Sequence, residues 1–251
     1  IAQLRAAPGG GAGVVAAAGN GWGAPSRRAN CQRVIGVGAL NRDGFKTTYS
    51  NFGVALAIST VGGDDNDGAW GPLLADSGIL TIGNGGSTSP ENCLVPGHSC
   101  YFSHFGTSFS APVVSGAVSL MLSVNPALTA AQIAAGLRVS ARPHVTSTVA
   151  GFGACSDANP GRCLCTTGTC GAGILDVEQA LLYAASPSTY AAPAAQAAIL
   201  DTAELRAAVA LGPDRPANPV PPPSGGGGAM SAGWLFALVL AGWALRCGVS
   251  A

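Results

Sequence analysis

This sequence is short of charge, and that shortage excludes one large class of partners. Only 10% of its 251 residues are Asp, Glu, Lys or Arg, and the formal net charge is zero. It has no arginine cluster and no aromatic stripe with which to bind phosphates and bases, so we expect no nucleic-acid partner. Histidine is also scarce. His98, His104 and His144 are the only three, which leaves few candidates for a general base.

Cysteine is plentiful by contrast, with eight in a chain rich in Gly, Ser, Thr and Asn. Cytosolic proteins rarely carry so many without metal motifs, so the composition indicates an oxidising compartment. Cys93 and Cys100 share one loop and are expected to form a local bridge. Two more disulfides are expected in a cluster whose pairing stays open: Cys155, Cys163, Cys165 and Cys170. A zinc site is the alternative there, but the spacing contains no C-x₂-C pair and no histidine joins it.

The remaining two cysteines have no obvious partner. Cys31 is left over in the globular part, which suggests a partner in polypeptide upstream of this sequence. Cys247 follows the apolar tail and is expected to be free.

Short apolar runs bounded by Gly and Asn indicate that residues 1–187 are globular. Three of them, at 13–20, 33–40 and 54–60, are predicted to be strands. Their apolar residues fall on both faces, as is typical of buried parallel strands.

Helical patterns follow these strands. The run after Ser108 is predicted to be a helix ending near Asn125, because Pro126 disfavours helical geometry in the residue before it. Thr129 and Gln132 form a capping-box pattern that opens a second helix. Strands that alternate with helices predict a layered α/β domain.

The composition changes after about Tyr190. Residues 188–228 form an Ala/Pro/Gly-rich linker with no means of burying a core. From Ala229 to Leu245 there are 17 uncharged residues with tryptophans near both ends. That length is at the short end of the roughly 17–25 residues that span a bilayer, and tryptophan suits the membrane interfaces. Residues 229–246 are therefore predicted to be a transmembrane or sorting-signal helix.

Two short segments carry candidate chemistry. In "GTSFSAPVVSG", Ser108 stands at the start of the predicted helix, where its own N–H and the positive end of the helix dipole suit a nucleophile that generates an oxyanion. A plain N-cap is the alternative. In "VVAAAGN", Asn20 ends a predicted strand. It is either an oxyanion donor or an ordinary turn residue, since "GNG" is a strong turn signal.

These segments closely resemble the subtilisin-like serine proteases, peptidase S8. "GTSFSAPVVSG" is similar to the serine motif of that family, and "VVAAAGN" to the segment that ends in its oxyanion-hole asparagine. "RVIGVGALNRDGFKTTYSNFG" and "GAGILDVEQAL" resemble the following strand and the closing element of the catalytic domain. The resemblance covers residues 1–187. It implies a parallel-sheet subtilisin-like fold, a Ser108 acyl-enzyme, Asn20 in the oxyanion hole, and protein or peptide substrates.

The base that Ser108 requires is missing from these patterns. In subtilisin-like enzymes the chain order is Asp, His, Ser, and none of the three histidines has the surroundings of the family's catalytic histidine. His104 as a substitute is less favoured than a solvated loop residue. We therefore expect a C-terminal portion of the catalytic domain, incomplete and inactive alone, with the N-terminal half that holds Asp and His as its partner.

Three further expectations complete the picture. The aspartates and asparagine of Gly62–Gly68 supply oxygen donors suited to a structural calcium ion or form a solvated acidic turn, while the chemistry itself requires no cofactor. The tail resembles a bacterial GlyGly-CTERM sorting signal, which implies a secreted or cell-surface protein anchored in the envelope. The alternative functions are a non-catalytic surface binding protein on a degenerate fold and a metal-binding membrane module.

Overall fold

The structure is a computed structural model that describes residues 13–84, 86, 88–90, 92–94 and 100–214. The chain divides into two units, Ile1–Pro219 and Val220–Ala251, and every described residue lies in the first. The helix expected at 229–246 lies outside the described residues, as do His98 and Cys247.

Three parallel strands form the central sheet, in the order β1 (Val14–Ala17), β2 (Val34–Leu40) and β3 (Ile58–Val61). All seven residues of β2 are buried, as its apolar residues on both faces predict. The predicted parallel sheet is confirmed. The third strand begins later than predicted, because Gly53, at φ +146°, turns the chain and leaves Val54 88% exposed.

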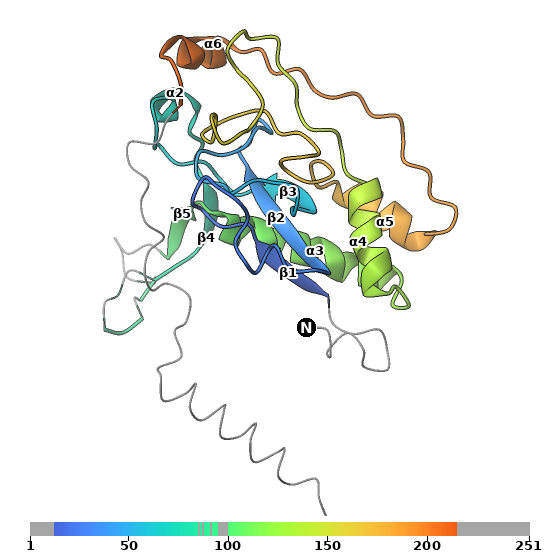
Figure 1. Cartoon of the computed structure of the whole chain (residues 1–251). Coiled ribbons are helices and arrows are strands. Elements are labelled where there is room, and N and C mark those ends of the chain that lie inside the picture. The colour runs from blue at the N-terminus through green and yellow to red at the C-terminus, as the bar shows by residue number, and fades with distance from the viewer. Residues whose placement is uncertain (1–12, 85, 87, 91, 95–99, 215–251) are drawn as a thin grey trace, which may run out of the picture. The chain divides into compact units, whose positions relative to one another are not determined.

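Helix α3 (Thr107–Val124) packs against all three strands, and α4 (Ala130–Val139) and α5 (Val177–Ala185) lie near its C-terminal end (Figure 1). The predicted capping box of Thr129 and Gln132 opens α4. The core between sheet and helices includes Val37, Ile58, Val114, Met121 and Leu137.

Among the described helices, α3 is the one long and apolar enough to cross a membrane by length and composition, with 18 residues and a mean hydropathy of 1.4. Its place in the fold accounts for that composition. Val114 and Met121 are fully buried against the sheet and the neighbouring helices.

A second core lies where α2 (Gly71–Leu74) contacts α6 (Ala203–Ala210). Helix α6 falls within the range where a linker is expected from the sequence, yet its Leu205 is buried. The indole N–H of Trp70 also donates to the carbonyl oxygen of Gly212, at 2.8 Å. Burying a leucine side chain stabilises a fold by roughly 1.5–3 kcal/mol, so this Ala-rich segment packs onto the domain.

A two-stranded antiparallel ribbon leads into α3. It consists of β4 (Ile79–Ile82) and β5 (Tyr101–His104). The Cys93–Cys100 disulfide, expected from the sequence, bridges the segment between the two strands. Since β5 ends at His104, the ribbon places the chain directly before the first turn of α3.

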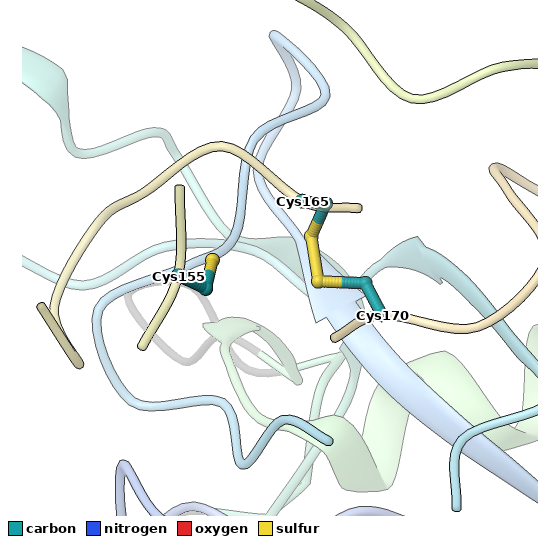
Figure 2. A group of neighbouring side chains, drawn as sticks. All are labelled: Cys155, Cys165 and Cys170. Atoms are coloured by element: carbon teal, nitrogen blue, oxygen red, sulfur yellow. A yellow bond between two sulfur atoms is a disulfide. The ribbon is translucent and has the colours of Figure 1, made fainter. Parts of the chain in front are cut away.

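The cysteine-rich loop contains the disulfides Cys155–Cys163 and Cys165–Cys170. The Sγ atoms of Cys155, Cys165 and Cys170 lie within 4.8 Å of one another (Figure 2). That spacing would suit a metal ion, but each sulfur belongs to a disulfide, and it is the thiolate that ligates metals. The two disulfides expected in this cluster are present, and the structure assigns the pairing that the sequence left open. Cys31 is the free cysteine of the described residues, and it is exposed.

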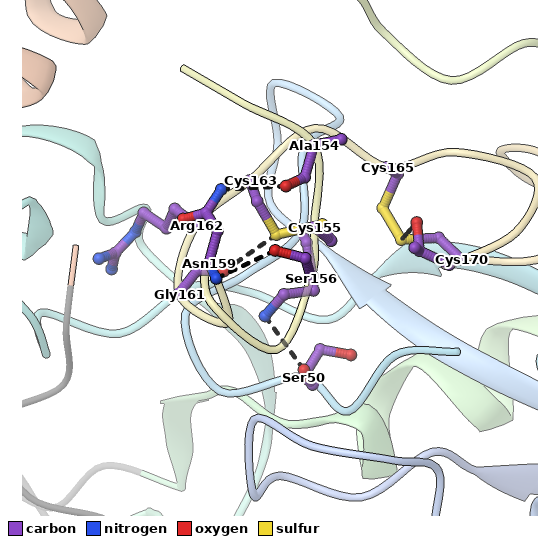
Figure 3. The surroundings of a disulfide bond; sticks show 12 residues. Ser50, Ala154, Cys155, Ser156, Asn159, Gly161, Arg162, Cys163, Cys165 and Cys170 are labelled. Carbon is purple, nitrogen blue, oxygen red and sulfur yellow. Dashed lines mark hydrogen bonds between the residues drawn. A yellow bond between two sulfur atoms is a disulfide. The ribbon is translucent and has the colours of Figure 1, made fainter. Parts of the chain in front are cut away.

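The acidic loop at 62–68 faces a cation supplied by the protein. Arg162, which is fully buried, extends out of the cysteine-rich loop on the side away from the Cys165–Cys170 bridge (Figure 3). Its guanidinium donates to five oxygens: both carboxylate oxygens of Asp64 (2.8 and 3.2 Å), one of Asp214 (3.2 Å), and the carbonyls of Asp65 (2.6 Å) and Asp67 (2.8 Å). The oxygens of this loop, which the sequence suggested as calcium ligands, are therefore bound by the Arg162 guanidinium.

Non-reducing digestion checks the pairing in the cysteine-rich loop. Trypsin cuts after Arg162 and chymotrypsin after the leucine that follows Cys163, so Cys155, Cys163 and Cys165 fall on different fragments. We expect mass spectrometry to find Cys155 linked to Cys163, and Cys165 linked to Cys170 within one fragment. A fragment joining Cys155 to Cys165 would contradict this pairing.

Arg162→Met should lower the free energy of unfolding by about 3–5 kcal/mol, because it leaves buried carboxylates without their partner. The measurement is urea denaturation of the parent polypeptide, meaning this chain together with any coding sequence upstream of it. Arg206→Met is the matched control. Arg206 pairs with Asp201 at 2.7 Å but its side chain is 66% exposed, and exposed pairs contribute about 0.2–1 kcal/mol. Equal, small losses in both variants would contradict the structural role of Arg162.

Candidate active site

Ser108 is the second residue of α3 and lies exposed at its N-terminal end. The N-cap is Gly106, so the interpretation of Ser108 as a plain N-cap is wrong. Among the described residues, neither the backbone N–H nor the hydroxyl of Ser108 has a hydrogen-bond partner. Because the first N–H groups of a helix are unpaired and carry the positive end of its dipole, this end can stabilise a developing negative charge.

Thr107 joins the start of α3 to the turn after β1. Its backbone N–H and its hydroxyl both donate to Asn20 Oδ1, at 3.0 and 2.8 Å. The Gly19 N–H donates in turn to Thr107 Oγ1, at 3.1 Å. Because an N–H can only donate, the atom of Asn20 that faces Thr107 must be the amide oxygen. The Asn20 amide group is thereby oriented, and its Nδ2 is the end left to donate.

Gly106 leaves a space that both candidate donors border. A Cβ atom placed on Gly106 would lie 3.2 Å from Asn20 Nδ2 and 3.8 Å from the backbone nitrogen of Ser108. The φ of Gly106 is +145°, a conformation that favours glycine. Two N–H donors beside one unfilled space are the arrangement that stabilises the oxyanion of a tetrahedral intermediate.

The described histidines make no hydrogen bond to Ser108. His104 is exposed on β5, and its ring stacks on Phe109 with the centroids 5.4 Å apart. His144 is buried, with Nε2 at 3.0 Å from the carbonyl oxygen of Gly171, and burial lowers its pKa. Neither ring is hydrogen-bonded to Ser108, so among the described residues no histidine is placed to take the proton of its hydroxyl.

Thr107 and Gly106 contact Asn20 or border the space beside it, and the sequence pattern did not single them out. Both lie inside the quoted "GTSFSAPVVSG" segment. A glycine before a helix indicates close approach of another group, and a hydroxyl residue there indicates local hydrogen bonding. Those signals exist, but they do not identify Asn20 as the partner.

Comparisons with known proteins relate this chain to a protease family. The model of the subtilase family, peptidase S8, matches residues 1–159. An extracellular protease of Xanthomonas campestris pv. campestris is 36% identical over 174 residues, which cover 68% of this chain and 23% of that protein.

A solved structure with a TM-score of 0.50 supports the same fold. A serine protease of Aeromonas sobria aligns over 76% of this chain and 39% of its own, with 21% identity and a TM-score of 0.50. A protease of Pseudoalteromonas arctica aligns over 66% of this chain and 41% of its own, with 27% identity and a TM-score of 0.49.

The chain spans about a quarter of the length of its curated Xanthomonas relative, 23%. The family match, by contrast, extends over more than half of this chain, from residue 1 to residue 159 of 251, and includes both Asn20 and Ser108. The chain belongs to the subtilase family of serine peptidases, peptidase S8.

Proposed function

We propose that this chain carries the nucleophile and the oxyanion hole of a subtilisin-like serine endopeptidase that acts on proteins or peptides. The observation that carries the proposal is the space beside Gly106, which Asn20 Nδ2 and the Ser108 N–H border. The Ser108 side chain is exposed at the same helix end. The Xanthomonas relative is named an extracellular protease.

In the proposed reaction, a base takes the proton of the Ser108 hydroxyl while Oγ attacks the carbonyl carbon of the scissile peptide bond. The carbonyl oxygen becomes an oxyanion and accepts hydrogen bonds from Asn20 Nδ2 and the Ser108 N–H. The protonated base then gives its proton to the leaving amine as the C–N bond breaks, which leaves an acyl-enzyme on Ser108. Water, deprotonated by the same base, hydrolyses that ester.

We propose that the histidine base and its aspartate belong to polypeptide upstream of this sequence. The family's chain order places both before the serine, and the described histidines are not hydrogen-bonded to Ser108. The Xanthomonas relative is also much longer, since this chain covers 23% of it. This chain alone is then inactive.

The edge of β1 is a suitable surface for that upstream part to bind. Within the part of the chain that the structure describes, strand β1 is the end strand of the parallel sheet, and its four residues are only partly buried. A groove of about 330 Å³ runs beside it, and most of its wall is apolar, formed by Val15, Ile35, Val118, Leu122, Ala130 and Ile133. An open sheet edge beside an apolar groove favours association with further strands and helices, and we assign that cover to the upstream half of the catalytic domain.

We further propose that the enzyme works outside the cytoplasm. Its described part has three disulfides, which persist in oxidising compartments. Anchoring by residues 229–246 belongs to the same proposal. The chemistry calls for no cofactor, and a structural calcium ion at Gly62–Gly68 would compete with Arg162 for the carboxylate of Asp64.

Ser108→Ala in the parent polypeptide should lower kcat by about 10⁶-fold, the magnitude known for the catalytic serine of subtilisin and adopted from it, and abolish labelling by a fluorophosphonate probe. Ser123→Ala is the matched control, because Ser123 lies on the same helix, is exposed, bonds only to the Leu120 carbonyl and lies outside the groove beside β1. Peptidase assays and mass spectrometry of the labelled peptide give the result. Full activity without the Ser108 hydroxyl would contradict the nucleophile, and labelling of Ser108 in the isolated chain would contradict an upstream base.

Asn20→Leu and Asn20→Asp should each lower kcat with little change in KM. The expected loss is about 10²–10³-fold, the value known for the corresponding donor of subtilisin and adopted from it. The Asp variant is the sharper test, because its carboxylate still accepts from Thr107 and so preserves the junction, while the donor is lost. Steady-state kinetics on a peptide substrate check the split. A wild-type kcat for Asn20→Asp would contradict a donor role.

A further inference from the structure

A hydroxyl group from the segment after β2 holds the residue that precedes the active-site helix. Tyr49 is 6% exposed, and its hydroxyl accepts the N–H of Gly106 at 2.9 Å. The same hydroxyl faces the carbonyl oxygens of Gly62, at 2.9 Å, and Gly63, to which it donates. The Gly106 N–H also lies 3.0 Å from the Gly62 oxygen. One phenol thus joins the chain leaving β3 to the N-cap of α3.

The state of this phenol is fixed by its surroundings. Burial raises the pKa of Tyr49 above its ordinary value, so the hydroxyl keeps its proton across the pH range in which a peptidase works. It can therefore donate to a glycine carbonyl and accept from Gly106 at the same time. A phenylalanine ring would fill the same place and do neither.

The turn that carries Tyr49 is itself held from inside. Lys46 is 1% exposed, and its Nζ donates to the carbonyl oxygens of Thr47 (2.8 Å), Thr48 (3.3 Å) and Ser50 (3.1 Å). These carbonyls lie on both sides of Tyr49 along the chain. Because the buried Nζ of Lys46 donates to all three, it restrains the turn from which the phenol reaches Gly106.

Close backbone packing leaves little room for Gly106 to shift while these contacts hold. A Cβ atom on Gly62 would lie 3.0 Å from the Tyr49 hydroxyl, and one on Gly63 would lie 2.7 Å from the Cα atom of Gly78. The backbone that follows β3 is therefore in contact with the Tyr49 phenol. The Tyr49 hydroxyl and the Gly62 carbonyl oxygen both accept from the Gly106 N–H, and the hydroxyl adds the link to Gly63.

We propose that Tyr49 is a positioning residue for the oxyanion hole: it fixes Gly106 and, through it, the relative placement of Asn20 Nδ2 and the Ser108 N–H. This role depends on the function proposed above. Tyr49 touches neither the substrate nor the reacting atoms. Oxyanion donors must lie about 2.7–3.1 Å from the developing charge, so a small shift of Gly106 weakens binding of the transition state more than binding of the substrate.

Tyr49→Phe in the parent polypeptide should lower kcat by about 10- to 100-fold, the range expected when catalytic groups are misplaced by up to an ångström. KM should stay within about twofold, and the Ki of a peptidyl trifluoromethyl ketone should rise in parallel with the loss in kcat/KM. Rates are expressed per Ser108 site labelled by the fluorophosphonate, so that unfolded molecules do not count. Tyr183→Phe, which removes the hydroxyl of another buried tyrosine, is the matched control and should change neither constant.

The double variant Tyr49→Phe with Asn20→Leu separates a positioning role from a general structural one. If Tyr49 acts through the oxyanion hole, the double variant loses little more activity than Asn20→Leu alone. Losses that multiply, or a KM that rises while kcat holds, would overturn the inference. An unchanged kcat in Tyr49→Phe would also overturn it and leave the nucleophile assignment intact, whereas full activity in Ser108→Ala would remove the proposed function itself.

Discussion

The three hydrogen bonds at Thr107 determine where the two parts of the site meet. They join the turn after β1 to the start of α3, between residues 87 or 88 positions apart in the sequence. The apolar core places the strand and the helix, but it does not orient an exposed amide. Two bonds to one Asn20 oxygen, each worth about 0.5–1.5 kcal/mol, offset the side-chain entropy that orientation costs. The direction of the Asn20 donor therefore depends on a small polar junction and not on the hydrophobic core.

Other polar groups extend this junction into the loops around it. Tyr49 binds Gly106 and the carbonyls after β3, while Arg162 binds the acidic loop that continues from there and reaches Asp214 beyond α6. The Cys155–Cys163 disulfide restrains the loop from which Arg162 extends (Figure 3). Buried charges are costly unless fully paired. A loop held by such ion pairs has few alternative conformations. The acidic loop is therefore a rigid neighbour of the chain that contacts Tyr49 and Gly106.

Local patterns predicted the elements, and long-range contacts decided the rest. The apolar runs of β1 and β2 and the capping box of α4 are properties of short segments, so the sequence was sufficient for them. The disulfide pairing and the packing of α6 depend on which loops meet, and no local pattern encodes that. In the candidate site, motif resemblance predicted Ser108 and Asn20, and the structure places both beside Gly106. The Tyr49–Gly106 contact joins positions 57 apart, so neither the motif nor the periodicity could reveal it.

The groups that bind charge and the group that moves protons have different structural requirements in this protein. The oxyanion donors that we propose are oriented by contacts wholly within the described residues: Thr107 to Asn20, and Tyr49 to Gly106. Fixed donors of this kind need no reorganisation when the charge develops. In the assembly we propose, a base reaches Ser108 only when the upstream half of the domain covers the edge of β1 and its apolar groove. Changes near Gly106 should therefore alter transition-state binding, whereas changes in the groove should alter assembly of the site, because the two depend on separate sets of contacts.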